Sequence, residues 1–331
     1  MSNNKTPSHL AIGIDLGGTR IKGVLLDLST GKILQKNITP TDDGENSNWK
    51  VVVAQTVQHL KAMTTEPIRG IGLAAPGLPT VDNTAIACMP GRLQGLEGLR
   101  WADYLGEPVR VLNDAHAALM AEARLGAAKT ATNVAMLTLG TGVGGGLLIN
   151  GQLYQGFFQM AGHLGHISVD ADNENTDVTQ MPGSLEDAIG NVTVSRRSYG
   201  RYQTTYELVD GYRKGEPIAT LVWLKSIHRL AVALASIANA FSPELIILGG
   251  GITQANDALF DPLQTYIDLF EWRPAEKKQP SAKRILKIGP VPSEPQLSGM
   301  IKDQQIPESV FSDDLLTSPL RPVLYAHQKK Y

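Results

Sequence analysis

The stretch GIDLGGTRIKGV, from Gly13 to Val24, places a Gly-Gly-Thr turn between two apolar runs. The flanking segments AIGID and IKGVLLDL are rich in Ile, Val and Leu, which predicts two strands. Strands joined by so short a loop form an antiparallel hairpin. A dinucleotide-binding loop would instead open a helix, and the P-loop string G-x-x-x-x-G-K-[ST] does not occur in the chain. The turn therefore belongs to neither of these nucleotide-binding loops.

The backbone N–H groups of such a turn can hold an anion, because glycines leave them uncovered by side chains. Gly17 and Gly18 would supply these groups, and the hydroxyl of Thr19 would add a donor. Asp15 stands where a carboxylate could bind Mg²⁺ through water beside a phosphate. Taken alone, however, the two glycines are explained more simply by a tight turn without a ligand.

Two further glycine clusters change this interpretation. The segment LGTGVGGG, Leu139 to Gly146, repeats the pattern of strand, turn and strand, with Thr141 and Gly142 in the turn. Two such hairpins suggest two lobes that grip one phosphate chain from opposite sides. The third cluster follows the apolar strand ELIIL, where Gly250 and Gly251 would let the backbone approach a flat ring such as adenine. The joint pattern predicts two α/β lobes that bind a nucleotide.

The composition limits the expected partners and location. The 331 residues include 30 basic and 32 acidic side chains, which gives no electrostatic support for binding nucleic acid or a membrane surface. Cys88 is the single cysteine, which excludes an intrachain disulfide and favours a reducing compartment. The polar N-terminus lacks the apolar core of a signal peptide, and the longest apolar stretch, Leu230 to Phe241, is too short to span a bilayer. We therefore expect a soluble cytoplasmic protein.

Five segments resemble motifs of the ROK family (repressor, open reading frame, kinase), whose fold group includes hexokinase and actin. In chain order they are IGIDLGGTRIKGVLLD, LAAPGLPTVD, VLNDAHAALMAEARLGAAK, LTLGTGVGGGLLINGQLYQG and PELIILGGGI. The resemblance implies a two-lobed α/β fold of the actin-like ATPase (ribonuclease H-like) class with an interlobe cleft. It implies an N-terminal lobe over residues 1–117 and a C-terminal lobe over 118–300, and leaves open whether the tail, 301–331, returns to the first lobe.

The same resemblance implies a glucokinase-like enzyme that transfers a phosphoryl group from Mg-ATP to a hydroxyl of a hexose or N-acetylhexosamine. Asp114 would be the general base, since it stands between a strand and a helix and can accept the proton of a hydroxyl. Asn113 and Asp114 are also residue types that cap helices, so one residue or both could serve as an N-cap. The family implies a small-molecule sugar as partner and a homodimer as assembly.

The segment AGHLGHISVD departs from the family pattern Gly-Glu-x-Gly-His. His163 stands where that pattern has a glutamate that contacts the sugar, and His166 matches its histidine. The resemblance further implies that Gly77, Asn113 and Glu186 contact the sugar. A neutral imidazole offers one donor and one acceptor, whereas a carboxylate accepts hydrogen bonds from two hydroxyls. His163 therefore predicts either an altered sugar contact or a side chain turned away from the site.

The family's zinc-binding cluster, Cys-x-Cys-Gly-x-x-Gly-Cys-x-Glu, has no cysteine in this chain. The segment PGSLED matches its end, with Ser184 in the place of the last cysteine and Glu186 in that of the glutamate. His163 and His166 supply at most two of the four Cys or His ligands that structural zinc prefers. We therefore expect no zinc, and a polar loop from Asp170 to Ser184 shaped by packing and hydrogen bonds.

Two other functions were weighed against the kinase. A sugar-responsive repressor of this family needs a helix-turn-helix module, and only ten residues precede the first predicted strand. A catalytically weak sugar or nucleotide sensor would agree with the altered sugar segment and with QLSGMIKDQQ, a poor copy of the family's closing helix. Asp114 favours an active enzyme, because a protein without activity is free to lose its base.

Overall fold

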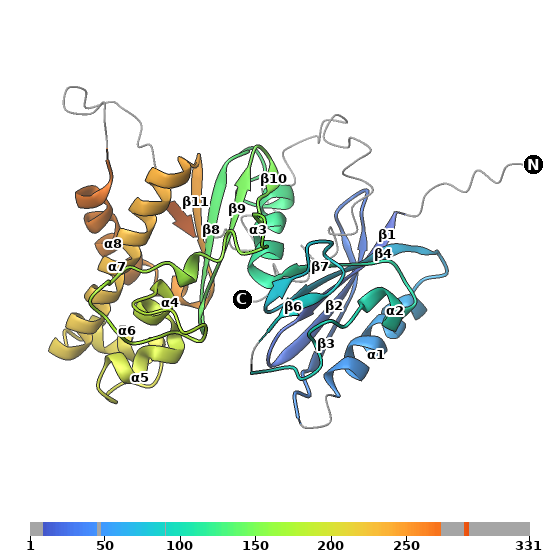
Figure 1. The fold of residues 1–331 in the computed structure, drawn as a ribbon, viewed down its shortest axis with the longest axis horizontal. Coiled ribbons are helices and arrows are strands. Elements are labelled where there is room, and N and C mark those ends of the chain that lie inside the picture. The colour runs from blue at the N-terminus through green and yellow to red at the C-terminus, as the bar shows by residue number, and fades with distance from the viewer. Residues whose placement is uncertain (1–8, 45–47, 90, 273–287, 291–331) are drawn as a thin grey trace, which may run out of the picture. The chain divides into compact units, whose positions relative to one another are not determined.

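The structure is a computed structural model that describes residues 9–44, 48–89, 91–272 and 288–290. The chain divides into two compact units (Figure 1). The first unit contains the described parts of Met1–Gly126 and Gly156–Met160, and the second those of Ala127–Gln155 and Ala161–Val291. The predicted lobe boundary between residues 117 and 118 lies inside a continuous helix, and the units divide only after that helix ends. The predicted tail, 301–331, lies outside the described residues.

The first unit is built on a five-stranded sheet in the order β3-β2-β1-β4-β7. Strands β1 and β2 pair antiparallel, with Leu16 opposite Ile21 beside the turn, which confirms the predicted hairpin. Helix α1 buries Val53, Val57 and Leu60 in the same apolar core as the strands. The elements of this unit are β1 (Leu10–Leu16), β2 (Arg20–Asp27), β3 (Ile33–Pro40), α1 (Trp49–Ala62), β4 (Ile68–Ala75), β5 (Leu78–Pro79), β6 (Ile86–Cys88), α2 (Trp101–Leu105), β7 (Val109–Asn113) and α3 (Asp114–Leu125).

The second unit repeats this plan with a sheet in the order β10-β9-β8-β11-β12. Its first two strands, β8 and β9, again form an antiparallel hairpin, as predicted. The strands are β8 (Val134–Leu139), β9 (Val143–Ile149), β10 (Gln152–Leu153), β11 (Leu245–Gly249) and β12 (Ile288–Pro290). The helices are η1 (Leu164–His166), α4 (Leu185–Ile189), η2 (Asn191–Thr193), α5 (Val194–Arg197), α6 (Thr205–Arg213), α7 (Pro217–Phe241), η3 (Gly251–Ala255) and α8 (Asp257–Phe270), where η marks a 3₁₀ turn.

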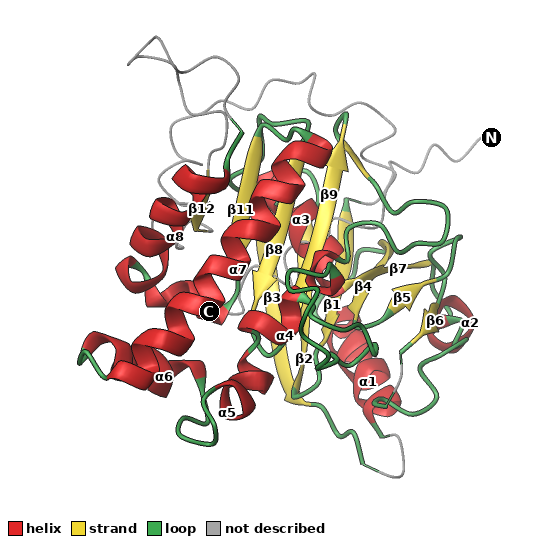
Figure 2. Cartoon of the chain, turned by 60° about the vertical axis from the view of Figure 1, so that its left-hand side comes forward, coloured by secondary structure: helices red, strands yellow, loops and turns green. Residues whose placement is uncertain are grey.

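Helix α7 is the central helix of the second unit. Figure 2 shows it in front of β8 and β11, whose side chains share its apolar core. By length and composition alone, it is the one described helix that could cross a membrane, and it extends the apolar stretch Leu230 to Phe241 toward the N-terminus. The helix starts earlier than the apolar run because Pro217 occupies its first turn, where a missing N–H costs nothing. However, 56% of its most apolar window is buried, and Trp223, Ile227 and Leu230 are fully covered, as expected of a core helix.

Parallel pairing gives each sheet one edge at which several strands end. In the first unit, β4 pairs in parallel with both β1 and β7, so the residues that follow these three strands share an edge. In the second unit, β8 pairs in parallel with β11, so the turn after β8 and the glycines after β11 share an edge. Ligands of α/β sheets commonly bind at such carboxyl ends. The fold therefore gathers the candidate residues of each unit along one edge.

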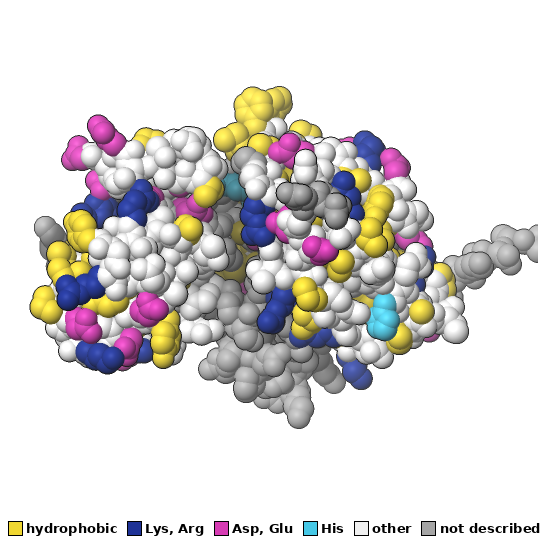
Figure 3. Space-filling view, turned by 90° about the horizontal axis from the view of Figure 1, so that it is seen from below, with side chains coloured by type: hydrophobic (Ala, Val, Ile, Leu, Met, Phe, Trp, Pro, Cys, Tyr) yellow, Lys and Arg dark blue, Asp and Glu magenta, His cyan; other side chains and the backbone are white. Residues whose placement is uncertain are grey.

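The described surface mixes charges of both signs. On the face drawn in Figure 3, acidic and basic side chains lie interspersed. Ion pairs such as Lys214–Asp210, at 2.6 Å, and Arg213–Asp257, at 3.2 Å, join neighbouring opposite charges. That face therefore lacks the extended positive field by which proteins attract nucleic-acid phosphates.

Candidate active site

The carboxyl edge of the first unit brings together residues from three strands. Asp15 lies near the end of β1, Gly77 follows β4, and Asn113 ends β7. The side-chain amide of Asn113 donates to the carbonyl oxygen of Gly77 at 3.1 Å, which ties the two loops to each other. Gly77 has a φ of +96°, and a Cβ there would lie 2.5 Å from the carbonyl oxygen of Cys88, so only glycine fits. Four predicted residues, including Asp114 at the start of α3, therefore lie on one edge.

Asn113 and Asp114 occupy different positions at the N-terminus of α3. The Oδ1 atom of Asn113 accepts hydrogen bonds from the backbone N–H groups of Ala115, at 2.9 Å, and His116, at 3.4 Å, so Asn113 is the N-cap. Asp114 is the first helical residue, and its Oδ1 accepts from Ala115 N at 2.9 Å. The Asp114 side chain is half-buried, whereas Asn113 is buried. Because Asn113 caps the helix, the second carboxylate oxygen of Asp114 remains available to accept a proton.

Asp15 has a charged neighbour that the sequence analysis did not identify. Its side chain is 1% exposed, and its Oδ2 lies 3.5 Å from Nζ of Lys22. The hairpin creates this pair, because the register places Asp15 opposite Lys22 on β2. Alternation of side chains along both strands was the signal that could have predicted it. A buried carboxylate balanced by an ammonium group suits a water-mediated contact with Mg²⁺ better than direct ligation of a bare ion.

The turn of the first hairpin is held by its carbonyl groups. The carbonyl oxygen of Gly17 accepts from the Thr41 hydroxyl at 2.6 Å, and that of Thr19 accepts from Thr41 N at 2.9 Å. The guanidinium of Arg92 donates to the carbonyl oxygen of Gly18 at 2.5 Å. The N–H groups of Gly18 and Thr19 have no hydrogen-bond partner among the residues that the structure describes. Two donors at the tip are thus available to an anion.

The turn of the second hairpin is held in the same way by different groups. Asn191 N donates to the carbonyl oxygen of Gly140 at 2.9 Å, and Val192 N donates to that of Thr141 at 3.0 Å. The carbonyl oxygen of Gly142 accepts from Gly140 N at 2.9 Å. Within the described parts of the chain, the N–H groups of Thr141 and Gly142 are left without a partner. This tip therefore also presents backbone donors rather than acceptors.

The third glycine cluster lies against the end of β8. Gly250 has a φ of +95°, and a Cβ there would come within 2.2 Å of the carbonyl oxygen of Leu139. Gly251, which begins η3, has nothing within 4 Å of its Cβ position. The two glycines thus differ: Gly250 permits close packing of two strand ends, and Gly251 leaves open backbone beside the second hairpin.

Three predicted sugar-contacting residues lie together in the second unit. The rings of His163 and His166 are stacked, with centroids 6.5 Å apart and planes 11° apart. Glu186, in α4, accepts from Val143 N at 2.9 Å through Oε2, and the same oxygen fills the space where Gly142 lacks a Cβ. Glu186 therefore fixes the second hairpin while its other oxygen stays available.

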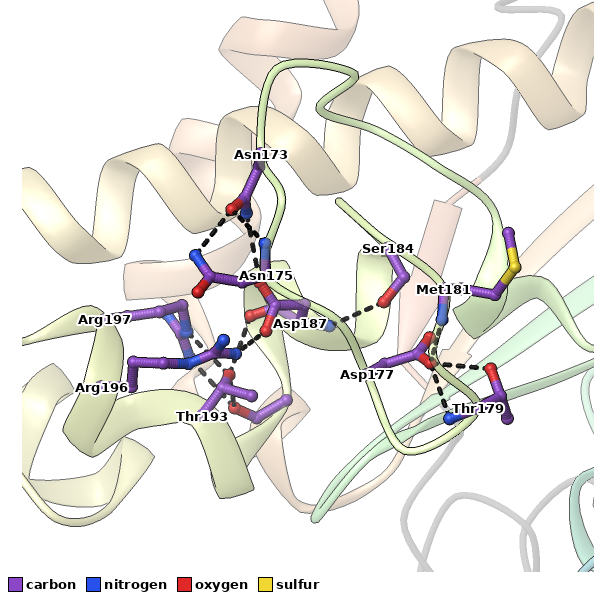
Figure 4. Close-up of polar contacts among 11 residues, drawn as sticks. Asn173, Asn175, Asp177, Thr179, Met181, Ser184, Asp187, Thr193, Arg196 and Arg197 are labelled. Atoms are coloured by element: carbon purple, nitrogen blue, oxygen red, sulfur yellow. Dashed lines mark hydrogen bonds and ion pairs between the residues drawn. The ribbon is translucent and has the colours of Figure 1, made fainter.

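Asp177 is the main residue that the sequence analysis missed. Its side chain is 0% exposed, and Oδ2 lies 2.8 Å from Nδ1 of His166. Its Oδ1 accepts from the backbone and hydroxyl of Thr179, at 2.8 and 2.7 Å, and from Met181 N at 3.1 Å (Figure 4). Burial raises the pKa of Asp177, but hydrogen bonds from Thr179, His166 and Ser184 outweigh it and lower the pKa to about 2. The carboxylate is therefore ionised at neutral pH.

The donor set of this loop does not fit a zinc site of the family type. Among the described residues, the ligand atoms of His166, Asp177 and Glu186 lie within 4.8 Å of one another, the one grouping close enough to suggest a metal ion. However, Asp177 already accepts from protein donors through both oxygens, and Glu186 accepts from Val143 N. No thiolate lies in the loop, since Cys88 belongs to β6 of the first unit. Structural zinc is bound by four ligands that are cysteine thiolates or histidine imidazoles, and this loop does not supply them.

Ion pairs and hydrogen bonds from arginine side chains hold the start of α4 and of the polar loop. Arg196 pairs with Asp187, whose other oxygen accepts from Asn173 at 3.2 Å (Figure 4). Arg197 donates to the carbonyl oxygen of Gly190 at 3.0 Å, and burial together with the neighbouring Arg196 and Arg229 lowers its pKa to about 10. Arg229 of α7 pairs with Asp170 at the start of the polar loop. Ion pairs therefore hold this loop and the start of α4, whereas the sequence analysis expected only packing and hydrogen bonds.

The chain is similar to proteins of known family and fold. The model of the ROK family matches residues 11–283. The glucokinase of Thermotoga maritima is 30% identical over 282 residues, and the match covers 78% of this chain and 87% of the glucokinase. The N-acetylgalactosamine kinase AgaK of a Shewanella species is 30% identical over 275 residues, with the same two coverages, 78% and 87%. A ROK family glucokinase from Streptomyces griseus, solved in complex with glucose and AMPPNP, superposes with a TM-score of 0.66 at 24% identity, covering 85% of this chain and 94% of its own. The fold is thus that of the actin-like ATPases.

Proposed function

Because the chain belongs to the ROK family, we propose that it phosphorylates a hydroxyl of a hexose or N-acetylhexosamine with ATP, using Asp114 as general base. The observation that carries this proposal is the division of roles at α3, where Asn113 caps the helix and leaves an oxygen of Asp114 available. Phosphoryl transfer needs a positioned hydroxyl and neutralised phosphate charge more than it needs covalent help from the protein. A carboxylate on a rigid strand-to-helix junction meets the first requirement.

Five of the predicted residues are assigned to the sugar. We assign Gly77 and Asn113 in the first unit, and His163, His166 and Glu186 in the second, to the sugar hydroxyls. These groups include amide and imidazole donors as well as carboxylate acceptors, and a hydroxyl needs partners of both kinds. Relatives named as glucokinase and N-acetylgalactosamine kinase support a hexose or its N-acetylamino derivative.

The two glycine turns would bind the phosphates of ATP. The N–H groups of Gly18, Thr19, Thr141 and Gly142, which have no partner in the described parts of the chain, support this assignment. We further assign Gly250 and Gly251 to the adenosine, because they lie at the same sheet edge as the second turn. Mg²⁺ would accompany the nucleotide and neutralise phosphate charge, with Asp15 orienting its water ligands.

The test is ATP turnover with a panel of glucose, N-acetylglucosamine and N-acetylgalactosamine. We expect at least one sugar to stimulate turnover, and the substitution Asp114→Asn to lower kcat on the order of 10²- to 10⁴-fold. Asp103→Asn is the matched control, because Asp103 is a 77% exposed carboxylate in the same unit. Equal rates for Asp114→Asn and the unsubstituted protein would show that the proposed base is wrong.

A sugar or nucleotide sensor of the same fold is the second candidate. His163 favours it, because an imidazole replaces the carboxylate expected at that sugar contact, and it stacks on His166. Calorimetric binding of a sugar without stimulated turnover, with any sugar of the panel, would favour the sensor over the kinase.

A further inference from the structure

The polar loop keeps the spacing of the zinc-binding cluster without its cysteines. Counting back from Ser184 along Cys-x-Cys-Gly-x-x-Gly-Cys-x-Glu, the first two cysteine positions fall on Asp177 and Thr179. The two glycine positions fall on Gln180 and Gly183, which have φ values of +65° and +60°. A residue other than glycine adopts such a φ rarely, so Gln180 indicates a backbone path that glycine would ordinarily follow.

Close packing supports the same path. A Cβ on Gly183 would lie 2.0 Å from the carbonyl oxygen of Asp170, which leaves room for glycine alone. Val169 N donates to the carbonyl oxygen of Gly183 at 2.8 Å, and Gly183 N donates to that of Asn175 at 3.0 Å. The loop is therefore closed by backbone hydrogen bonds at the positions where a metal ion would otherwise join its ends.

One of the four ligand positions holds a carboxylate, Asp177, and the other three hold neutral polar side chains. Asp177 accepts hydrogen bonds from His166 and Thr179, which occupy two of the other ligand positions of the cluster, and Ser184 occupies the third. The group is buried on the Asp177 side, where the carboxylate is 0% exposed, and open on the other, where His166 is 27% exposed. An anion with two side-chain donors thus stands where the family pattern has a cation with four side-chain ligands.

We propose that Asp177 replaces the structural zinc ion of this loop and holds His166 in the tautomer that carries its proton on Nδ1. A zinc ion bound at that nitrogen would require the lone pair there and would place the proton on Nε2. The carboxylate needs the opposite arrangement, because it can only accept a hydrogen bond. Asp177 is therefore a positioning residue, and Nε2 of His166 is an acceptor.

This assignment has a consequence for substrate binding that rests on the proposed sugar kinase function. An Nε2 without a proton accepts a hydrogen bond from a sugar hydroxyl, whereas an Nε2–H would donate one to the hydroxyl oxygen. The hydroxyl that meets His166 then retains its oxygen lone pairs for a second donor. In Asp177→Asn, the backbone N–H groups of Thr179 and Met181 keep the amide oxygen at the Oδ1 position, so the amide N–H faces Nδ1 of His166 and the ring proton moves to Nε2. Sugar affinity then changes without any change in the groups that bind ATP.

Two measurements on the unsubstituted protein test the proposal without an activity assay. Elemental analysis after purification with added zinc and gel filtration should find less than about 0.1 zinc per chain, and a chelator should leave the melting temperature unchanged. Nitrogen-15 spectra of histidine-labelled protein, with His166 assigned by the His166→Gln variant, should show the Nδ1–H tautomer. Stoichiometric zinc, or a proton on Nε2, would overturn the proposal whether or not the protein is a kinase.

Substitutions supply two further tests. In Asp177→Asn, we expect the tautomer to reverse and the KM for sugar to rise on the order of tenfold, with kcat and the KM for ATP within about threefold, the size of one altered hydrogen bond. Asp172→Asn, an exposed carboxylate of the same loop, is the control and should change neither. The triple variant D177C/T179C/S184C should bind about one zinc ion with His166. Failure of the triple variant to bind zinc, or an unchanged tautomer in Asp177→Asn, would contradict the shared geometry on which the proposal rests.

Discussion

The two units share a strand plan but present different chemistry at their carboxyl edges. Each opens with an antiparallel hairpin followed by parallel strands. The first unit adds carboxylates at that edge, Asp15 and Asp114, and ties its turn with the exposed side chain of Arg92. The second unit adds glycines at that edge and ties its turn with backbone groups of η2 and the buried Glu186.

This difference agrees with the different roles that the proposed function assigns to the two edges. Carboxylates suit the work of taking a proton and orienting the water around Mg²⁺. Neutral backbone amides suit the binding of phosphates and a close approach to the adenosine. The first turn is held by an exposed side chain, Arg92, and the second by a buried one, Glu186. The two turns should therefore tolerate substitution differently, and replacing individual glycines tests this prediction.

The largest effect is expected at Gly250. The change Gly250→Ala places a methyl group 2.2 Å from a backbone oxygen of β8 and forces a φ of +95° on alanine. Neither strand end can move without breaking the β8–β11 pairing, so we expect a loss of roughly 2–4 kcal/mol in the free energy of unfolding. Urea unfolding measures it. Gly251→Ala is the neighbouring control, with open space around its Cβ, and equal losses for the two variants would contradict the account.

The second effect concerns Asp177 and the pH dependence of stability. Its pKa is about 2 in the folded protein against an ordinary 3.8, so its contribution is present above pH 3.8 and is lost as the pH falls through about 2. The unsubstituted protein should exceed Asp177→Asn by roughly 2 kcal/mol above pH 4, and the difference should shrink toward pH 2. Denaturant unfolding at several pH values measures this difference. A gap that stays constant over that range would argue against an ionised, hydrogen-bonded carboxylate.

The third effect lies in the turn of the second hairpin. In Gly142→Ala the new Cβ would lie 2.2 Å from Oε2 of Glu186, a buried side chain that is bonded to Val143 N. Glu186 must move or the turn must deform, so we expect the KM for ATP to rise on the order of tenfold, as for the loss of one good hydrogen bond. Initial rates at varied ATP, with melting temperature as the control for folding, provide the measurement.

The smallest effect is expected in the turn of the first hairpin. Gly18→Ala creates a contact of the same length, 2.2 Å, but with the end of the Arg92 side chain, which is 51% exposed. That side chain can swing into solvent at little cost, so we expect the KM for ATP to change less than about threefold. A larger change in Gly18→Ala than in Gly142→Ala would reverse the comparison between the two units.

The two hairpins could be predicted because apolar runs and glycine turns are local signals. The prediction of β1 and β2 needed only the apolar runs on either side of Gly17 and Gly18, and residue type alone narrowed the N-cap of α3 to Asn113 or Asp114. Asp177 was missed because its role depends on a contact with His166, eleven residues away, that only the folded loop creates. The supports at Thr41 and Arg92 were missed for the same reason, since they reach the first turn from distant segments.

The most direct test of the account is a crystal structure of the protein with AMPPNP and the sugar that best stimulates turnover. The account predicts a carboxylate oxygen of Asp114 within about 2.6–3.2 Å of the hydroxyl that points at the γ-phosphate. A different side chain at that hydroxyl, with Asp114 bonded only to protein groups, would contradict it.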